Sequence, residues 1–322
     1  MNPSVLVTGA DGLVGAWLVK ALLEDGARVV VIRRDAPAVS ALAQLGLTGS
    51  VDVVNGDICT DGLVGRVLGE YRVDSVFHLA AQTQVGPANR SPVPTFETNI
   101  RGSWLVLEAC RLHEVQRVVV ASSDKAYGHR SDLPYRETHA LQPVYPYDVS
   151  KAACDTLARS YWHTFELPVA VTRFANVYGG GDLNRARLIP ETVCAALAGE
   201  APVVRSDGSP QRDFLYVEDA VDAYLAIWAA LGREKGRGEA FNAGGGKPYR
   251  VLEVLELICR LAGASVVPDI RGDGVPHGEI DRQWVDSTKL HELTGWRPKV
   301  SLEEGLRRTI EWYREHPAAR IR

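Results

Sequence analysis

The sequence is poor in the residue patterns that build metal sites and disulfide frameworks. Its five cysteines lie far apart and form no CxxC pair: Cys59, Cys110, Cys154, Cys194 and Cys259. The eight histidines show neither HxxxH nor HExxH spacing. We therefore expect no metal, and we expect thiols that stay reduced, as thiols do in a cytoplasm.

Long apolar runs and an excess of one charge are missing as well. No run approaches the ~18 residues that span a bilayer, and a strand is expected to begin by Ser4, before any apolar signal segment fits. The 36 Lys and Arg residues nearly balance the 40 Asp and Glu residues, which gives a formal net charge of −4. We expect a cytoplasmic protein that has neither nucleic acid nor a membrane as a partner.

Residues 1–175 alternate short β-branched runs with longer amphipathic stretches. Near-continuous apolar strands separated by helices indicate a parallel sheet that is covered on both faces. The predicted fold class is therefore α/β with a doubly wound parallel sheet. Strands are predicted at Val5 to Thr8, Arg28 to Ile32, Val51 to Asn55, Ser75 to Leu79, Arg117 to Ser122 and Val169 to Phe174.

After Asn176 the chain becomes richer in Gly, Pro and Arg. No internal repeat, low-complexity tract or long linker interrupts it, so we expect a smaller part, residues 176–322, packed against the first. Helices are predicted there at Pro190 to Leu197, Val217 to Leu231, Val251 to Ala262 and Leu302 to Glu315.

A glycine turn follows the first predicted strand. The run from Gly9 through Gly12 to Gly15 joins that strand to a helical stretch, Ala16 to Glu24. Glycines allow a tight turn and let backbone N–H groups approach a pyrophosphate, which then lies at the positive end of the helix. The order strand, glycine turn, helix predicts a dinucleotide-binding Rossmann unit.

Charged residues end the next two strands. An acidic residue after the second strand accepts the ribose hydroxyls of NAD, whereas an arginine there binds the 2′-phosphate of NADP. Arg33 and Arg34 favour NADP, Asp35 keeps NAD open, and solvated loop charges are the alternative. After the third strand, Asp57 either accepts a hydrogen bond from the adenine amino group or caps the next helix.

Tyr147 and Lys151 are four residues apart in a predicted helix, so they share one face. An ammonium beside a phenol lowers the pKa of the phenol and makes it a usable base. Ser122, Ser123 and Asp124 end the preceding strand, at the sheet edge where doubly wound folds bind ligands. These residues predict a catalytic site there.

Five segments can now be read together: TGxxGxxG with Gly9, Gly12 and Gly15, then His78 to Ala81, Ser122 to Gly128, Tyr147 with Lys151, and Arg173 to Gly179. Together they resemble the NAD-dependent epimerase/dehydratase family of extended short-chain dehydrogenases. The resemblance spans essentially the whole chain.

The resemblance implies a triad of Ser123, Tyr147 and Lys151, in which the tyrosine takes the proton of a sugar 4-hydroxyl as hydride leaves for the nicotinamide. Lys151 would also hold the nicotinamide ribose, and Asn99 would be the structural asparagine. The other residues expected at the cofactor are Gly9, Gly12, Leu13, Val14, Gly15, Arg33, Arg34, Asp57, Ile58, Leu79, Ala80 and Ala81.

The family also implies a C-terminal part that binds a nucleotide-diphosphate sugar, with residues 214–242 returning to the first part. The expected substrate-binding residues are Asn176, Arg187, Arg212 and Arg282. The RPGE pattern that is common before the last of these is replaced by residues 275–279, VPHGE.

The residues after Ser123 discriminate between reactions. Epimerases of the family usually carry a small residue there, whereas dehydratases carry an acid, and this chain has Asp124 followed by Lys125. Oxidation at the 4-position acidifies the 5-hydrogen, a base removes that hydrogen, and an acid protonates the departing 6-hydroxyl. Asp124 is the candidate acid, which requires a raised pKa. Lys125, which stands where commoner dehydratases place glutamate, is the candidate base.

A 4,6-dehydratase is therefore predicted. The GGGD run ending at Asp182, the RLIPE run beginning at Arg187, and His277 with Glu279 resemble CDP-glucose 4,6-dehydratases, which makes CDP-glucose the first candidate substrate. A nucleotide-sugar 4-epimerase is the alternative, and a dinucleotide-binding protein without turnover is a third. The family further suggests a homodimer through residues 103–113 and 151–165, whose aromatic residues could equally be core.

Overall fold

Seven parallel strands form the largest sheet of the computed structural model, which describes residues 2–35, 37, 39–275 and 279–320. Their order is β10-β6-β5-β4-β1-β2-β3, and each neighbouring pair is parallel. The predicted doubly wound α/β fold is confirmed. The strands are β1 (Ser4–Thr8), β2 (Arg28–Arg33), β3 (Asp52–Asn55), β4 (Ser75–His78), β5 (Arg117–Ala121), β6 (Val169–Phe174) and β10 (Ala240–Ala243).

The six predicted strands differ from the observed ones by at most a single residue at either end. The seventh, β10, was not predicted as a strand. It is four residues long, contains no β-branched residue, and is fully buried beside β6. Its sequence therefore lacks the strand signal, and its pairing is decided by the tertiary fold.

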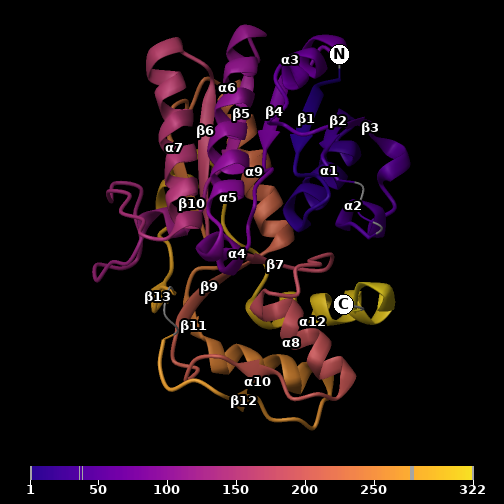
Figure 1. Cartoon of the computed structure of the whole chain (residues 1–322), viewed down its shortest axis with the longest axis vertical. Helices are drawn as coiled ribbons and strands as arrows, with labels where there is room; N and C mark the ends of the chain where they lie inside the picture. Colours follow the sequence, from indigo (N-terminus) through magenta and orange to yellow (C-terminus); the bar gives the residue numbers. More distant parts are fainter. Residues whose placement is uncertain (1, 36, 38, 276–278, 321–322) are drawn as a thin grey trace.

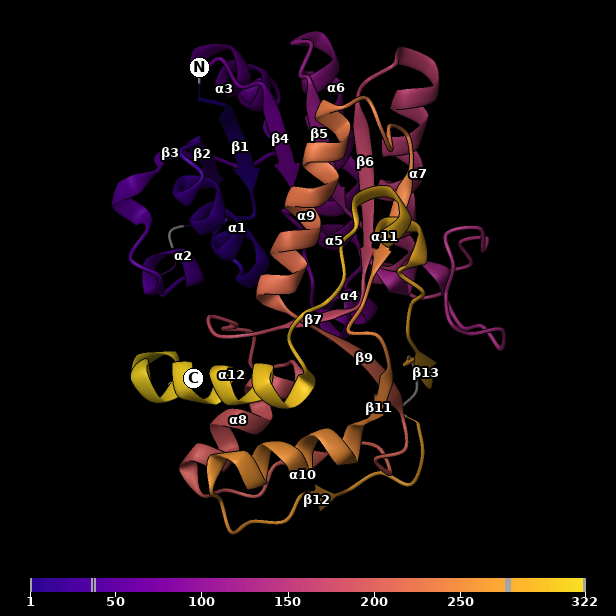
Figure 2. The same cartoon turned by 180° about the vertical axis from the view of Figure 1, so that it is seen from behind.

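Helices cover both faces of this sheet (Figures 1 and 2). Side chains of α3 (Leu63–Glu70), α6 (Gly102–Leu112) and α7 (Pro146–Phe165) pack in one core with Leu6, while α1 (Leu13–Glu24) and α9 (Val217–Gly232) pack in the other with Val5 and Val7. Because most residues of the inner strands are buried on one face or the other, these strands form continuous apolar runs in the sequence.

The helix after the glycine turn begins at Leu13, earlier than the predicted Ala16. Gly12 is its N-cap, and Gly15 lies so close to the turn that a Cβ there would come 2.3 Å from the backbone oxygen of Gly9. The glycines therefore belong to the helix start itself and bring the first turn of α1 against the end of β1.

The remaining chain forms a smaller part below the sheet edge in Figure 1. Its core joins three helices, α8 (Leu188–Ala198), α10 (Val251–Ala262) and α12 (Leu302–Glu315). A second sheet has the order β11-β9-β13, with β7 also paired to β9. Its strands are β7 (Asn176–Tyr178), β9 (Gln211–Tyr216), β11 (Pro248–Arg250) and β13 (Arg282–Gln283). The other short elements of the smaller part of the sequence are β8 (Val203–Val204), β12 (Asp269–Ile270) and α11 (Thr288–Thr294). Three short helices belong to residues 1–175: α2 (Ala41–Gln44), α4 (Val85–Arg90) and α5 (Val93–Phe96).

Two elements return from the second part of the sequence to the large sheet. Helix α9 packs against α1, and β10 extends the sheet next to β6. The division into residues 1–175 and 176–322, with 214–242 returning, stays a proposal that these contacts support. Among the described helices, none is long and apolar enough to cross a membrane.

Candidate active site

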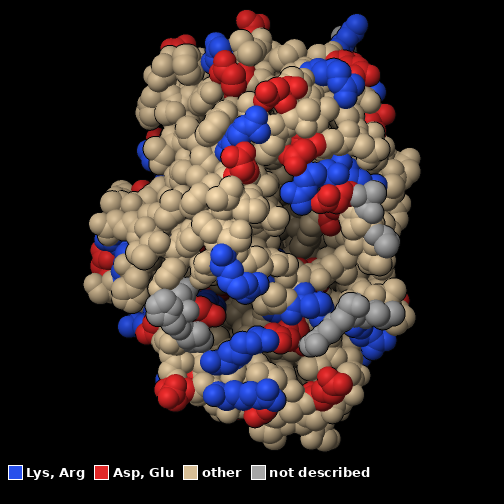
Figure 3. Space-filling view, in the orientation of Figure 1, with Lys and Arg blue, Asp and Glu red and all other residues tan. Residues whose placement is uncertain are grey.

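The predicted site residues gather where the strands of the large sheet end, above the second part of the chain. The glycine turn follows β1, Leu79 follows β4, and Ser123 follows β5. Figure 3 shows the surface hollowed between the two parts, with Lys and Arg side chains around the opening. Ends of adjacent parallel strands are the usual ligand site of such folds.

The glycine turn fits a pyrophosphate. No side chain caps the N-terminus of α1, which leaves the first N–H groups, around Leu13 and Val14, for an anion. Gly9 has φ +77°, and a Cβ there would come 2.7 Å from the backbone nitrogen of Ala80. The turn therefore lies directly against the chain that leaves β4, where Leu79, Ala80 and Ala81 remain partly exposed.

Arg33 is held by a carboxylate next to the turn. Its Nε and Nη2 donate to the two oxygens of Asp11 at 2.9 and 3.0 Å. Arg34 instead pairs with its exposed neighbour Asp35 at 2.8 Å. The bidentate pair fixes the guanidinium beside the cofactor end of β2, while Arg34 extends into solvent.

The side chain of Asp57 stabilises a local turn of the backbone. Its Oδ1 accepts a hydrogen bond from the backbone N–H of Cys59 at 2.8 Å. Ile58 is buried, and its side chain fills the space beside Gly102. Ile58 therefore contributes to the packing beneath the candidate site.

Tyr147 and Lys151 lie in the first turns of α7, which begins at Pro146, where the fixed φ of proline suits a helix start. Nζ of Lys151 donates to the backbone oxygen of Ala121 at 2.8 Å, and Oγ of Ser122 donates to the backbone oxygen of Lys151 at 3.0 Å. These contacts tie the helix to the end of β5, the strand that leads to Ser123.

Burial raises the pKa of Tyr147 to about 12, while the charge of Arg187 and a hydrogen bond with Ser123 oppose that rise. Burial therefore outweighs the charges that lower the pKa of this phenol, and the effect expected of Lys151 stays a prediction. The ammonium is committed to the carbonyl of Ala121, and desolvation of the phenol dominates.

Asp124 has the raised pKa that an acid needs. The side chain is buried at the start of a 3₁₀ turn, Asp124–Tyr127. Burial raises its pKa to about 6, against the lowering effect of Lys125. One oxygen accepts from Oγ of Ser123 at 3.2 Å, and the other is buried without a hydrogen-bond partner among the described residues.

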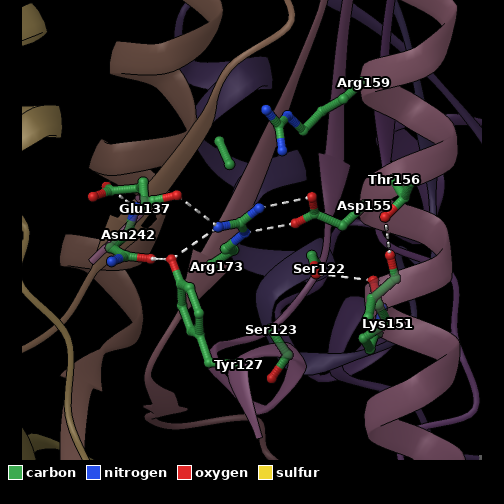
Figure 4. A network of polar contacts seen from close by, with 12 residues as sticks. Ser122, Ser123, Tyr127, Glu137, Lys151, Asp155, Thr156, Arg159, Arg173 and Asn242 are labelled. Atoms are coloured by element: carbon green, nitrogen blue, oxygen red, sulfur yellow. Dashed lines mark hydrogen bonds and ion pairs between the residues drawn. The ribbon is translucent and has the colours of Figure 1, made fainter. Parts of the chain in front are cut away.

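A buried network holds this turn in place (Figure 4). Arg173 donates to both oxygens of Asp155 on α7 at 2.7 and 2.9 Å, and to the hydroxyl of Tyr127 at 3.0 Å. That hydroxyl donates to Oδ1 of Asn242 at 2.8 Å. The turn that carries Asp124 is thereby fastened to β6, α7 and β10.

Asn99 also has a structural position. Its amide nitrogen donates to Oγ of Ser150 at 2.8 Å, and its oxygen accepts from the backbone N–H of Gln82 at 2.7 Å. It joins the chain after β4 to helix α7.

Two of the expected substrate-binding residues face the candidate catalytic groups. The charge of Arg187 acts on Tyr147, and that of Arg212 acts on Asp124. Arg187 is held by Asp182 at 3.1 Å, and Arg212 donates to the backbone oxygen of Asp281 at 2.8 Å. Both are thus positioned near the site by the second part of the chain.

The other two lie differently. Asn176 donates to the backbone oxygen of Asp213 at 3.1 Å, and Arg282 is exposed, with its guanidinium 5.2 Å from the ring centre of Trp284. His277 lies outside the described residues, and Glu279 pairs with Arg212 at 3.3 Å.

Sequence reasoning missed two buried polar side chains. Asp148 follows Tyr147 directly, and Gln283 lies beside Asp124. An acid in the first helical turn is common, so Asp148 gave no distinct signal, and nothing in the sequence singles out Gln283. In the described part of the chain, no group of three or more His, Cys, Asp or Glu side chains is arranged to hold a metal ion.

Comparison with known proteins agrees with this arrangement. A family model described as GDP-mannose 4,6 dehydratase matches residues 6–309. The dTDP-glucose 4,6-dehydratase of Xanthomonas campestris pv. campestris is 33% identical, over 96% of this chain and 92% of its own length.

Two solved structures are similar over nearly all of both chains. A dTDP-glucose 4,6-dehydratase from Streptomyces venezuelae, solved with NAD, has a TM-score of 0.88 and 31% identity over 98% of each chain. A UDP-glucose 4-epimerase from Thermotoga maritima, solved with UDP-glucose, has a TM-score of 0.90 and 31% identity over 98% of this chain and 99% of its own. The epimerase/dehydratase resemblance is confirmed, and the chain belongs to the GDP-mannose 4,6 dehydratase family of extended short-chain dehydrogenases.

Proposed function

We propose that this protein is a nucleotide-sugar 4,6-dehydratase. The observation that carries the proposal is Asp124, a buried carboxyl with a raised pKa of about 6 that lies next to Ser123. A protonated carboxyl can donate to a departing 6-hydroxyl, a step that an epimerase does not need. The dehydratases among the similar proteins support the same choice.

In the proposed reaction, Tyr147 takes the proton of the 4-hydroxyl, and Ser123 orients that hydroxyl by hydrogen bonding. A nicotinamide bound there would supply the acceptor for the hydride of the 4-position and its donor to the 6-position. Lys151 would hold the ribose of that cofactor, and it keeps helix α7 against the end of β5. Asp124 gives its proton to the leaving 6-hydroxyl, which departs as water.

An epimerase remains the second candidate, because a similar solved structure is a UDP-glucose 4-epimerase. Incubation of the purified protein with CDP-, dTDP-, UDP- and GDP-activated hexoses, followed by mass analysis, separates the two. We expect a product that has lost one water. A product of unchanged mass with the opposite configuration at the 4-position would identify an epimerase instead.

CDP-glucose is the first substrate to test, and dTDP- and UDP-glucose are the next because the relatives act on them. The GGGD resemblance has a packing explanation of its own. A Cβ at Gly180 would come 2.3 Å from the ring of Trp312, and Asp182 pairs with Arg187. The motif therefore supports the family more strongly than it supports the nucleotide. If CDP-glucose is not converted while another nucleotide-activated glucose is, the proposed nucleotide is wrong and the proposed reaction still holds.

The cofactor is proposed to be a nicotinamide dinucleotide. Arg33 and Arg34 favour NADP, whereas the solved dehydratase relatives contain NAD. If Arg33 binds a 2′-phosphate, calorimetric titration should give NADP binding at least as tight as NAD binding, and Arg33→Ala should weaken NADP alone. A strong preference for NAD that survives Arg33→Ala would show that the pair with Asp11 is structural only.

A homodimer through α6 and α7 and a cytoplasmic location also stay proposals. The two helices lie side by side on one face (Figure 1), where Trp104 and Phe165 are 40% and 51% exposed. Tyr161 and Trp162 are partly buried against the core beneath. A monomeric mass in light scattering would contradict the dimer.

A further inference from the structure

Asp148 carries a buried carboxyl group whose burial is not balanced by a hydrogen bond to one of its two oxygens. Its side chain is 3% exposed, and its Oδ1 is buried without a hydrogen-bond partner among the described residues. A buried, unpartnered carboxylate oxygen costs stability. Burial accordingly raises the pKa of Asp148 to about 6, with Lys125 acting in the opposite direction. A group kept in this condition beside Tyr147 points to a use in the site.

Asp148 and Asp124 lie on two elements that pack against each other. Helix α7 packs against the turn that carries Asp124. The charges of both carboxyls act on Tyr147 and on Tyr135, and Lys125 acts on both carboxyls in return. The two acids therefore lie near each other, and the charge of Lys125 acts on both.

This arrangement bears on which group removes the 5-hydrogen. A lysine ammonium donates hydrogen bonds and has no acceptor atom, whereas an ionised carboxylate has two acceptor oxygens. A carboxylate with a free, desolvated oxygen is the better acceptor.

We propose that Asp148, rather than Lys125, is the catalytic base that takes the proton from the 5-position of the sugar. The inference rests on the dehydration proposed above. The bond from C5 to hydrogen breaks, and the proton moves to Oδ1 of Asp148. The electron pair forms the C5–C6 double bond, and the 6-hydroxyl leaves as water with the proton of Asp124. When hydride returns to C6, Asp148 gives its proton back to C5, and the proton that Tyr147 took restores Asp124 through solvent.

The test compares Asp148→Asn with Lys125→Met in deuterium oxide, with a turnover substrate found from the hexose panel. Asp148→Asn should still oxidise the 4-position within about tenfold of the wild-type rate. Loss of water should fall by at least ~10²-fold, the typical contribution of a general base, and no deuterium should enter at C5. Lys125→Met should keep C5 exchange. Asp61→Asn, at a side chain that is 83% exposed and pairs with Arg101, is the control for the same chemical change.

The outcomes separate the possible failures. Water loss within about threefold of wild type in Asp148→Asn, together with a stall in Lys125→Met, would make Lys125 the base and overturn the inference while dehydration stands. A wild-type enzyme that never eliminates water would overturn both. Cofactor binding by Asp148→Asn, measured by titration, distinguishes a folded but stalled enzyme from a misfolded one.

Discussion

Replacing Tyr147 by phenylalanine should lower turnover by ~10²-fold to 10⁴-fold, the range typical of a lost general base. The phenol is the group that takes the 4-hydroxyl proton in the proposed reaction. The ring stays in place, so α7 keeps the contact of Lys151 with the backbone oxygen of Ala121 and the contact of the buried Asp155 with Arg173. Initial rates of product formation, measured with saturating cofactor, give the size of the loss.

The control for this variant lies on the same helix. Tyr161→Phe removes a hydroxyl that donates to Glu108 at 3.2 Å, outside the candidate site. Its rate should stay close to wild type. A Tyr147→Phe enzyme that also turned over at that rate would remove the phenol from the mechanism.

Asp124→Asn should block the reaction after its first chemical step. An amide is a poor acid at any working pH, so the 6-hydroxyl lacks its proton donor, while oxidation at the 4-position needs only Tyr147 and the cofactor. With a substrate deuterated at the 4-position, the wild-type product should carry the label at C6. The variant should accumulate reduced cofactor, seen by its absorbance, and should release little product.

The pH profile tests the same assignment. Because burial raises the pKa of Asp124 to about 6, the protonated form is abundant below that pH and declines above it. Elimination should therefore slow as pH rises above about 6, and this descending limb should be absent from the residual activity of Asp124→Asn. Below about 6, protonation of Asp148, the proposed base, should slow elimination as well. Return of the deuterium to C4 in the wild-type enzyme, without mass loss, would instead identify an epimerase and leave Asp124 a binding role.

Patterns of residues predicted the large sheet because its strands are buried on both faces. Val29 to Ile32 is apolar at every position, since alternate side chains enter different cores. Tyr147, Lys151 and Asp124 could be placed because each is tied to a local feature, a helical spacing or a strand end. Their roles stay predictions until they are measured.

The sequence does not predict properties that depend on contacts between distant segments, such as burial, pKa shifts and the pairing of a short strand. Desolvation of Tyr147 outweighs its charged neighbours, which include Arg187 from the second part of the chain. In the sequence, Asp148 is an ordinary acid in a first helical turn, and only the structure shows that its side chain is buried. Strand β10 has no apolar run to mark it and is recognised only by its pairing with β6.

Helix α9 and strand β10 pack on the large sheet but come late in the sequence, which limits how far the chain can fold while it is being synthesised. One face of the sheet is built from residues as early as Val5, yet one of the two helices that pack on it, α9, begins only at Val217. While the ribosome is still making the intervening residues, the apolar side chains of β1 and α1 that pack against α9 lack that part of their cover. Such a nascent chain exposes surface that aggregates or recruits chaperones. A stop codon placed after residue 175 should therefore yield an insoluble fragment, whereas one placed beyond Ala243 would release a chain that can close the sheet.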